Sequence, residues 1–273
     1  MIHMLRLTLA LFLSIPLLAQ VSTYQAGRAL DAIRVDGNLD EFTWAALPRV
    51  GRFTNIRQAD QSTAAPTEAV LAWDDTNLYV AFASIDPMPW GTMYQRDSRI
   101  WEEEVVEVFL DPDGDGLNYP ELEVSPHNVV VDLLIPRRGG TAGDAIKWDI
   151  AGLRTAVNKH AAGWAAEIAI PWSALEEAGI KQKPNVGDKW RVGLYRIERP
   201  GDASKGREAA SLRAKLGDAE AAAKKGMLAE IDKLYLDTQW LAWSPTRVKY
   251  GFHDPERFGV VEFVLTPQAK SIP

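Results

Sequence analysis

The stretch Thr67–Asp86, TEAVLAWDDTNLYVAFASID, decides the fold class because it holds two apolar runs joined by a turn. Each run has the length of a β-strand, and the Asp-Asp-Thr-Asn segment between them is typical of a hairpin connection. Similar runs recur at fairly even spacing, in residues 104–111, 119–125, 128–136, 153–159, 163–172, 189–198 and 258–265. We therefore predict an all-β fold, an antiparallel two-sheet β-sandwich of immunoglobulin-like or jelly-roll-like type.

Residues 202–234 depart from this pattern, since they are rich in Ala, Lys and Glu. Apolar residues recur there three or four positions apart, as on one face of a helix: Leu212, Leu216, Ala219, Ala223, Met227 and Ile231. A glycine at 217 or 226 would divide the segment into two helices. We predict a helical insertion between two strands, packed as a cap on one end of the sheet.

The N-terminus resembles a secretory signal, with a basic start, the apolar run LTLALFLSIPLLA and a small residue at Ala19. The run falls short of the roughly 20 apolar residues of a membrane span and contains Pro16. An uncleaved anchor is the alternative. We predict a signal over residues 1–19, a single domain over 20–273 without a membrane span, and secretion to the periplasm or the extracellular space.

Composition narrows the function classes. The 273 residues include no cysteine, which excludes a disulfide framework and a thiolate metal site. The formal net charge of −7 argues against nucleic acid as a partner, and a neutral ligand fits better. The ten tryptophans offer flat apolar faces that suit both cores and stacking on sugar rings.

The acidic stretch WEEEVVEVFLDPDGDG, Trp101–Gly116, allows several interpretations. Glycoside hydrolysis needs two carboxyl groups at a fixed separation, but consecutive glutamates in a loop fix none. Along a strand, Glu107 and Phe109 would share one face while Val106 and Val108 take the other. A lone glutamate on a strand face is usually solvated, so the sequence signal for catalysis is weak.

The aspartates of the same stretch resemble a calcium loop in part. Asp111, Asp113, Asp115 and Gly116 match positions one, three, five and six of the helix-loop-helix calcium signature. The twelfth position is Leu122 and not the required glutamate, and the flanks are predicted strands. The three aspartates could still hold Ca²⁺ with oxygens from elsewhere, or they could form a hairpin turn with the glycines.

Six segments stand out along the chain: VDGNLDEFTW (35–44), LAWDDTNLYVAFASIDP (71–87), IWEEEVVEVFLDPDGDGLNYPELEVSP (100–126), GWAAEIAIPWSAL (163–175), WRVGLYRIER (190–199) and FHDPERFGVVEF (252–263). In their nature and order they resemble the family 9 carbohydrate-binding modules, and the resemblance covers nearly all of the chain outside the helical insertion. The resemblance implies a sandwich that binds sugar between two tryptophans. The first aligns with Trp101, and the strand glutamate aligns with Glu107. At the second this chain has Phe252 followed by His253, so one wall has less stacking surface.

Polar side chains inside strand patterns complete the predicted site, because a sugar pocket needs charged groups for hydroxyls as well as aromatic planes. Period two places Glu121 with Glu123 on one face, and Arg196 with Glu198 on one face. A salt bridge of the arginine that joins neighbouring strands is the alternative. The predicted ligand-binding residues are Trp101, Glu107, Glu123, Arg196, Glu198, Phe252 and His253.

The leading hypothesis is a secreted, non-catalytic module for a mono-, oligo- or polysaccharide, linked to carbohydrate catabolism. Some exported electron-transfer domains similar to this family bind haem b, for which Met88, Met93 and His127 are the candidate ligands. Hydrolysis of O-glycosyl bonds is the third hypothesis. Four further tryptophans near turns could line a groove, and the sequence does not rank them: Trp90, Trp148, Trp240 and Trp243.

Overall fold

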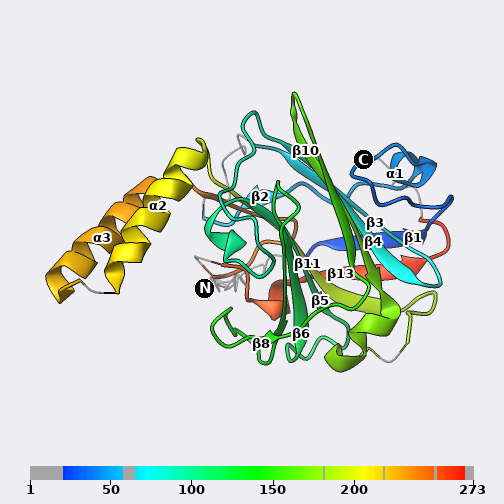
Figure 1. Cartoon of the computed structure of the whole chain (residues 1–273). Coiled ribbons are helices and arrows are strands. Elements are labelled where there is room, and N and C mark those ends of the chain that lie inside the picture. Colours follow the sequence, from blue (N-terminus) through cyan, green and yellow to red (C-terminus); the bar gives the residue numbers. More distant parts are fainter. Residues whose placement is uncertain (1–20, 58–64, 181, 218, 249–250, 268–273) are drawn as a thin grey trace, which may run out of the picture.

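The computed structural model describes residues 21–57, 65–180, 182–217, 219–248 and 251–267. Its strands hydrogen-bond into one curled sheet of 13 strands, so the predicted all-β class is confirmed (Figure 1). The strands are β1 Thr23–Arg28, β2 Thr54–Asn55, β3 Thr67–Trp73, β4 Asn77–Ile85, β5 Val105–Asp111, β6 Tyr119–Val124, β7 Val130–Ile135, β8 Ile146–Lys147, β9 Arg154–His160, β10 Gly163–Pro171, β11 Lys189–Glu198, β12 Gln239–Ala242 and β13 Gly259–Val264. The helical elements are α1 Phe42–Ala46, η1 Ile100–Glu102, η2 Trp172–Ala178, α2 Ala203–Leu216, α3 Ala221–Leu234 and η3 Pro255–Arg257.

The strand order is β8-β7-β6-β5-β11-β13-β1-β3-β4-β10-β9, and β12 pairs with β11 and β2. Sequence neighbours pair antiparallel, as predicted, in β3–β4, β5–β6, β6–β7 and β9–β10. The sheet is nevertheless mixed, and not wholly antiparallel as the sequence suggested. The N-terminal β1 lies between β13 and β3 and runs parallel to both, so it joins the two halves of the sheet.

The predicted hairpin joins β3 to β4. The Oδ1 atom of Asp74 accepts backbone N–H bonds from Thr76 at 2.7 Å and Asn77 at 2.8 Å. A short acidic side chain that binds the backbone two or three residues ahead is a common way to close a turn. The turn fixes the register in which Trp73 lies opposite Leu78.

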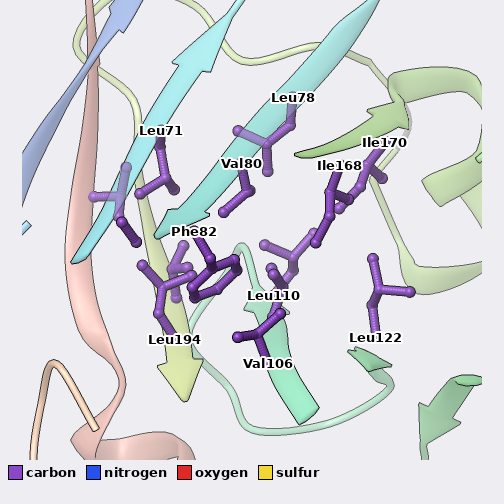
Figure 2. Packing of buried hydrophobic residues seen from close by; sticks show 14 of the residues in the cluster. Leu71, Leu78, Val80, Phe82, Val106, Leu110, Leu122, Ile168, Ile170 and Leu194 are labelled. Carbon is purple, nitrogen blue, oxygen red and sulfur yellow. The ribbon is translucent and has the colours of Figure 1, made fainter. Parts of the chain in front are cut away.

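The main core lies between two facing parts of the curled sheet (Figure 2). Side chains of β3, β4 and β10 face side chains of β5, β6 and β11, and the cluster includes Leu71, Leu78, Val80, Phe82, Ile168, Ile170, Val106, Leu110, Leu122 and Leu194. Because side chains alternate along a strand, the core takes every second residue of β5, β6 and β11. The residues between them lie on the opposite face, where the cavity described below is found.

The helical insertion is a pair of helices, α2 and α3, which project from the sheet (Figure 1). Helix α2 ends before Gly217, whereas Gly226 lies inside α3. The pair contacts the segment that precedes β5: a Cβ on Gly206 would lie 2.6 Å from the Trp90 ring, and Arg213 binds Glu102 at 2.9 Å. The insertion therefore braces η1 more than it caps the sheet.

No described helix combines the length and apolar character that crossing a bilayer requires. The predicted signal over residues 1–19 lies outside the described residues, and so does the proposed cleavage position. The signal stays a prediction.

Candidate functional site

A cavity of about 510 Å³ opens on the face of β5, β6 and β11 that points away from the main core. Its lining comes from these strands, from η1, from β12 and from two loops. The lining residues are Arg99, Trp101, Glu107, Phe109, Glu121, Glu123, Thr141, Ala142, Gly143, Ile197, Trp240, Gly251, Phe252 and His253. The cavity thus combines five of the seven predicted ligand-binding residues.

Strand alternation places the acidic groups of the cavity. In β5, Val106 and Val108 belong to the main core, so Glu107 points to the cavity, as the sequence predicted. In β6, Glu121 and Glu123 do the same. The register sets Glu107 directly opposite Glu123, a like-charge pair that is unfavourable in a sheet.

The three glutamates form one compact, buried group. One carboxylate oxygen of each lies within 4.8 Å of those of the other two, and the three residues are 1 to 3% exposed. The Oε2 atoms of Glu121 and Glu123 are buried and have no hydrogen-bond partner among the described residues. Buried carboxylate oxygens without donors are costly, which suggests that the cavity is built to receive a donor group.

Burial also raises the pKa values of these carboxyl groups. Desolvation, and then the charge of Glu121, raises the pKa of Glu107 well above its usual value. Desolvation, and then the charges of Glu107 and Glu121, does the same to the pKa of Glu123. Burial raises the pKa of Glu121 to about 7, although the interaction with the neighbouring Glu123 side chain opposes the rise. Some of the three groups therefore carry protons near neutral pH.

Aromatic side chains form the walls. Trp101 in η1 and Trp240 in β12 are both partly exposed, so their rings have surface to offer a ligand. Phe252 also lines the cavity, but it is 2% exposed and stacks on Tyr195 with ring centres 4.2 Å apart. Trp240 meets Phe252 edge-on at 5.4 Å. The stacking surface at this wall thus belongs to Trp240 more than to Phe252.

Trp240 is one of four tryptophans near turns that the sequence alone does not rank. Of these, Trp90, Trp148 and Trp243 are buried and Trp240 lines the cavity. Strand alternation in the segment Gln239–Ala242 could in part have assigned Trp240 to the cavity. Leu241 is a fully buried core residue, so its neighbours in the strand point to the other face. The face of β12 that meets the cavity depends on its pairing with β11, which the sequence does not reveal.

Arg199 holds the tryptophan of η1 in place. Its guanidinium is buried and donates to the backbone oxygens of Trp101 at 3.1 Å and Glu103 at 3.0 Å, and to the Thr238 hydroxyl at 2.7 Å. Arg99 lies over the Trp101 ring at 5.6 Å. The backbone that carries the ring is therefore fixed by the fold, which reduces the reordering that ligand binding requires.

His253 contributes no charge to the site at neutral pH. Burial lowers the pKa of its imidazole to about 4. Its Nδ1 atom lies 3.0 Å from the Tyr119 hydroxyl, and its Nε2 atom lies 3.9 Å from Oε2 of Glu121. The ring is thus a neutral wall beside the three glutamates.

The structure does not bring Arg196 and Glu198 to this cavity. Tyr195 is the register partner of Glu107, so Arg196, the next residue, points to the opposite face of β11. There its guanidinium is fully buried and binds Glu198 and, at 3.0 Å, Asp86. It also donates to Thr67 Oγ1 and to the Ile85 backbone oxygen, both at 3.2 Å. The alternative interpretation of Arg196, a salt bridge that joins neighbouring strands, is the arrangement found.

The aspartate loop closes the turn after β5. Asp111 accepts backbone N–H bonds from Gly114 and Gly116, both at 3.1 Å, and these two glycines have φ of 72° and 74°. Burial, and then the charges of Asp113 and Asp115, raises the pKa of Asp111 to about 6. One oxygen of each aspartate lies within 4.8 Å of the others, a spacing that a cation could also use.

The candidate haem ligands lie outside the cavity. His127 has both ring nitrogens engaged, with Nε2 3.2 Å from the Gly91 oxygen and Nδ1 3.2 Å from Lys159 Nζ. Met88 is 54% exposed, and Met93 packs against a smaller hydrophobic cluster. Axial ligation by this histidine would require it to leave at least one of these contacts.

A pH test follows from the buried carboxyl groups. Because the pKa of Glu121 is raised from 4.5 to about 7, the folded chain holds a proton that the unfolded chain loses at lower pH. The free energy of unfolding should fall as pH rises from about 4.5 through 7. In Glu121→Gln this fall should be smaller by about 1–3 kcal/mol between pH 5 and 8, measured by urea unfolding.

The exposed Glu68 is the control, because its side chain is 62% exposed and Glu68→Gln should leave the pH dependence unchanged. Equal pH slopes for Glu121→Gln and the wild-type chain would show that Glu121 is ionised normally in the folded state.

Comparisons with known proteins give sequence relatives that are much longer than this chain. The chain is 27% identical over 157 residues to Exoglucanase XynX of Acetivibrio thermocellus and 25% identical over 151 residues to Endo-1,4-beta-xylanase A of Thermotoga neapolitana. The matches cover 58% and 55% of this chain and 13% of each relative. The chain thus corresponds to a small part of those proteins.

Solved structures share the fold. A family 9 carbohydrate-binding module from Caldicellulosiruptor kristjanssonii, in complex with cellotriose, has a TM-score of 0.53 and 16% identity, with 92% of this chain and 98% of that chain covered. A structure from Bacteroides uniformis has a TM-score of 0.60 and 14% identity, with 89% and 100% covered. At such identities the likeness concerns the fold.

The sequence family agrees with this fold. The family described as carbohydrate family 9 binding domain-like matches residues 35–265, which include the cavity and the helical insertion. The chain therefore belongs to the carbohydrate family 9 binding domain-like family and is a carbohydrate-binding module.

Proposed function

We propose that the cavity binds the end of a sugar chain without catalysis. The observation that carries this proposal is the position of two partly exposed tryptophans, Trp101 and Trp240, beside three buried glutamates. Pyranose rings have apolar C–H faces that stack on indoles and hydroxyl rims that donate hydrogen bonds to carboxylates. The roles of Trp101, Glu107, Glu123, Phe252 and His253 as ligand contacts are part of this proposal.

Fold relatives support the choice of ligand. The Caldicellulosiruptor kristjanssonii module was solved with cellotriose and with glucose. A cavity of about 510 Å³ is large enough for one or two sugar rings, in the range of ordinary small-molecule sites. We therefore take a β-linked glucan end as the first ligand to test.

The protonation of the carboxyl groups supports binding over hydrolysis. Glycosidases use two carboxyl groups, one protonated and one that stays ionised. In this cavity burial raises the pKa of all three carboxyl groups, which disfavours an ionised nucleophile.

We also propose that the chain is exported. The apolar N-terminus supports export, with cleavage after Ala19 giving one domain over residues 20–273. The mass of the exported chain tests the cleavage, since retention of residues 1–19 would contradict it.

The layering of the sheet is a further part of the proposal. Packing of β3, β4 and β10 against β5, β6 and β11 supports a two-sheet sandwich.

Calorimetry tests the binding itself. Glucose, cellobiose and cellotriose are titrated into the mature chain at pH 7, with a folded protein confirmed by circular dichroism. We expect saturable binding of at least one of them. Absence of heat from all three, together with absence of binding to xylo-oligosaccharides and chitosan oligosaccharides, would contradict a sugar function for the cavity.

Calcium at Asp111, Asp113 and Asp115 stays a prediction. The three carboxylates supply fewer than the six to eight oxygens that Ca²⁺ takes, so the remainder would be water or backbone oxygens. If the ion binds, 1 mM Ca²⁺ should raise the unfolding midpoint of the wild-type chain, and Asp113→Asn should reduce the increase. An identical midpoint in Ca²⁺ and in chelator would exclude the ion.

A further inference from the structure

We propose that the sugar bound in this cavity carries a primary ammonium group, as in a glucosamine unit, and that Glu107, Glu121 and Glu123 together receive it. This inference rests on the proposed sugar-binding function and names its ligand class. It starts from the two buried carboxylate oxygens, Oε2 of Glu121 and Oε2 of Glu123, that line the cavity without a donor.

The geometry of the glutamates matches an ammonium group. A primary ammonium has three N–H donors, and three carboxylates present one oxygen each within 4.8 Å of the others. A nitrogen that makes charge-assisted hydrogen bonds of about 2.8 Å can reach three oxygens at that spacing. A single hydroxyl group donates one hydrogen bond, so a neutral sugar needs two hydroxyls to reach both buried oxygens, whereas one ammonium group can reach both.

The charge of the cavity also calls for a cation. Among the described lining residues, Arg99 is the one with a permanent positive charge, and it is exposed and paired with Glu102 at 2.8 Å. His253 is neutral at pH 7, because burial lowers the pKa of its ring to about 4. Three carboxyl groups thus face the cavity without a described counter-charge, whereas the carboxylates at Arg196 have one.

The walls favour an organic cation over a metal ion. Ca²⁺ takes six to eight oxygens and Mg²⁺ requires a near-octahedral set. Besides the three glutamates, the described side chains of the lining offer the Thr141 hydroxyl as a further oxygen, and the walls are largely aromatic. Indole faces attract organic cations through their quadrupole and stack on the ring that carries the amine.

Proton release should accompany binding of the amine. Burial raises the pKa of the three carboxyl groups, so the free cavity holds protons near neutral pH. An ammonium group stabilises the ionised carboxylates and displaces those protons into the buffer. A neutral sugar has no charge with which to ionise the glutamates, and its binding should release few protons.

The experiment is a calorimetric comparison on the mature wild-type chain at pH 6.5. Glucosamine, glucose and N-acetylglucosamine are titrated, and the trimers of glucosamine and glucose follow. An amine beside several oxygens has a pKa close to the value of about 8 of an α-amino group, so it is charged at this pH. We expect glucosamine to bind about tenfold more tightly than glucose, with heat that depends on the ionisation enthalpy of the buffer.

A charge-removing variant with a matched control assigns the effect to the cavity. Glu123→Gln keeps the side-chain shape and should lose the preference for glucosamine over glucose. Glu68→Gln removes an exposed charge elsewhere and should retain the preference. Glu121→Gln provides a second test if the first variant does not fold.

Each outcome decides between the two proposals. Binding of glucose with equal or greater affinity than glucosamine overturns the ammonium assignment and leaves sugar binding intact. Saturable binding of CaCl₂ or MgCl₂ that is lost in Glu123→Gln assigns the glutamates to a metal ion and also overturns it. Absence of binding by every sugar overturns the sugar function and the assignment that rests on it.

Discussion

Trp101→Ala is expected to weaken binding of cellotriose, or of the sugar that binds best, by about a hundredfold. The indole is partly exposed in the cavity, and Arg199 holds its backbone in position at 3.1 Å. Removal of an aromatic side chain at the centre of a binding site costs about 2–4 kcal/mol, and each 1.4 kcal/mol is a factor of about ten in the dissociation constant. Calorimetry measures the change.

Two variants serve as controls for this effect. Trp101→Phe keeps a smaller ring and should give an intermediate affinity, because less surface is left for stacking. Phe42→Ala removes an aromatic side chain that is 65% exposed and does not line the cavity, so its affinity should match the wild-type chain. A folded Trp101→Ala protein with unchanged affinity would place the sugar elsewhere on the molecule.

The sequence predicted the fold class and much of the cavity because both depend on local patterns. The alternation in β5 and β6 correctly placed Glu107 opposite to the core-facing valines, and Glu121 on the same face as Glu123. The hairpin of β3 and β4 was readable from its turn. Period-two alternation and turn residues are properties of neighbouring positions, so a single sequence can reveal them.

Properties that depend on distant pairing could not be read in this way. Arg196 and Glu107 are both buried polar residues in strand patterns, and the register of β11 on β5 decides that they lie on opposite faces. The parallel insertion of β1 between β13 and β3 is likewise a non-local choice. Phe252 was taken as a stacking wall, yet its face is covered by Tyr195, a residue 57 positions away in the sequence.

A second cluster of buried carboxyl groups surrounds Arg196, outside the cavity. Asp86, Glu104 and Glu198 have carboxylate oxygens within 4.8 Å of one another, and Arg196 supplies their buried positive charge. Burial, and then the charges of Glu198 and Asp86, raises the pKa of Glu104 to about 10. Burial raises the pKa of Glu198 to about 7, although Arg196 opposes the rise. Arg196 is therefore the cation that bonds directly to the cluster, and the charges of Lys159 and Arg199 also act on Glu104.

Arg196→Met should reduce the free energy of unfolding by about 3–5 kcal/mol at pH 8, because removing one partner leaves buried charges without compensation. It also removes the link from β11 to Thr67 in β3 and to the Ile85 oxygen in β4. The loss should be smaller at pH 5. Without the arginine the folded-state pKa of Glu198 rises further, so protonation below that pKa neutralises the group, and stability falls as pH increases.

Urea unfolding at pH 5 and pH 8 measures both effects. Arg34→Met is the matched control, since its side chain is 70% exposed and pairs with Asp36 at the surface, where solvent screens such a pair and its removal should change stability little. The double variant Arg196→Met, Glu198→Met should recover part of the stability, because it removes an uncompensated charge together with its partner. If Arg196→Met were as stable as the wild-type chain at pH 8, the buried carboxyl groups would already be neutral. The hydrogen bonds of the guanidinium to β3 and β4 would then contribute little to stability.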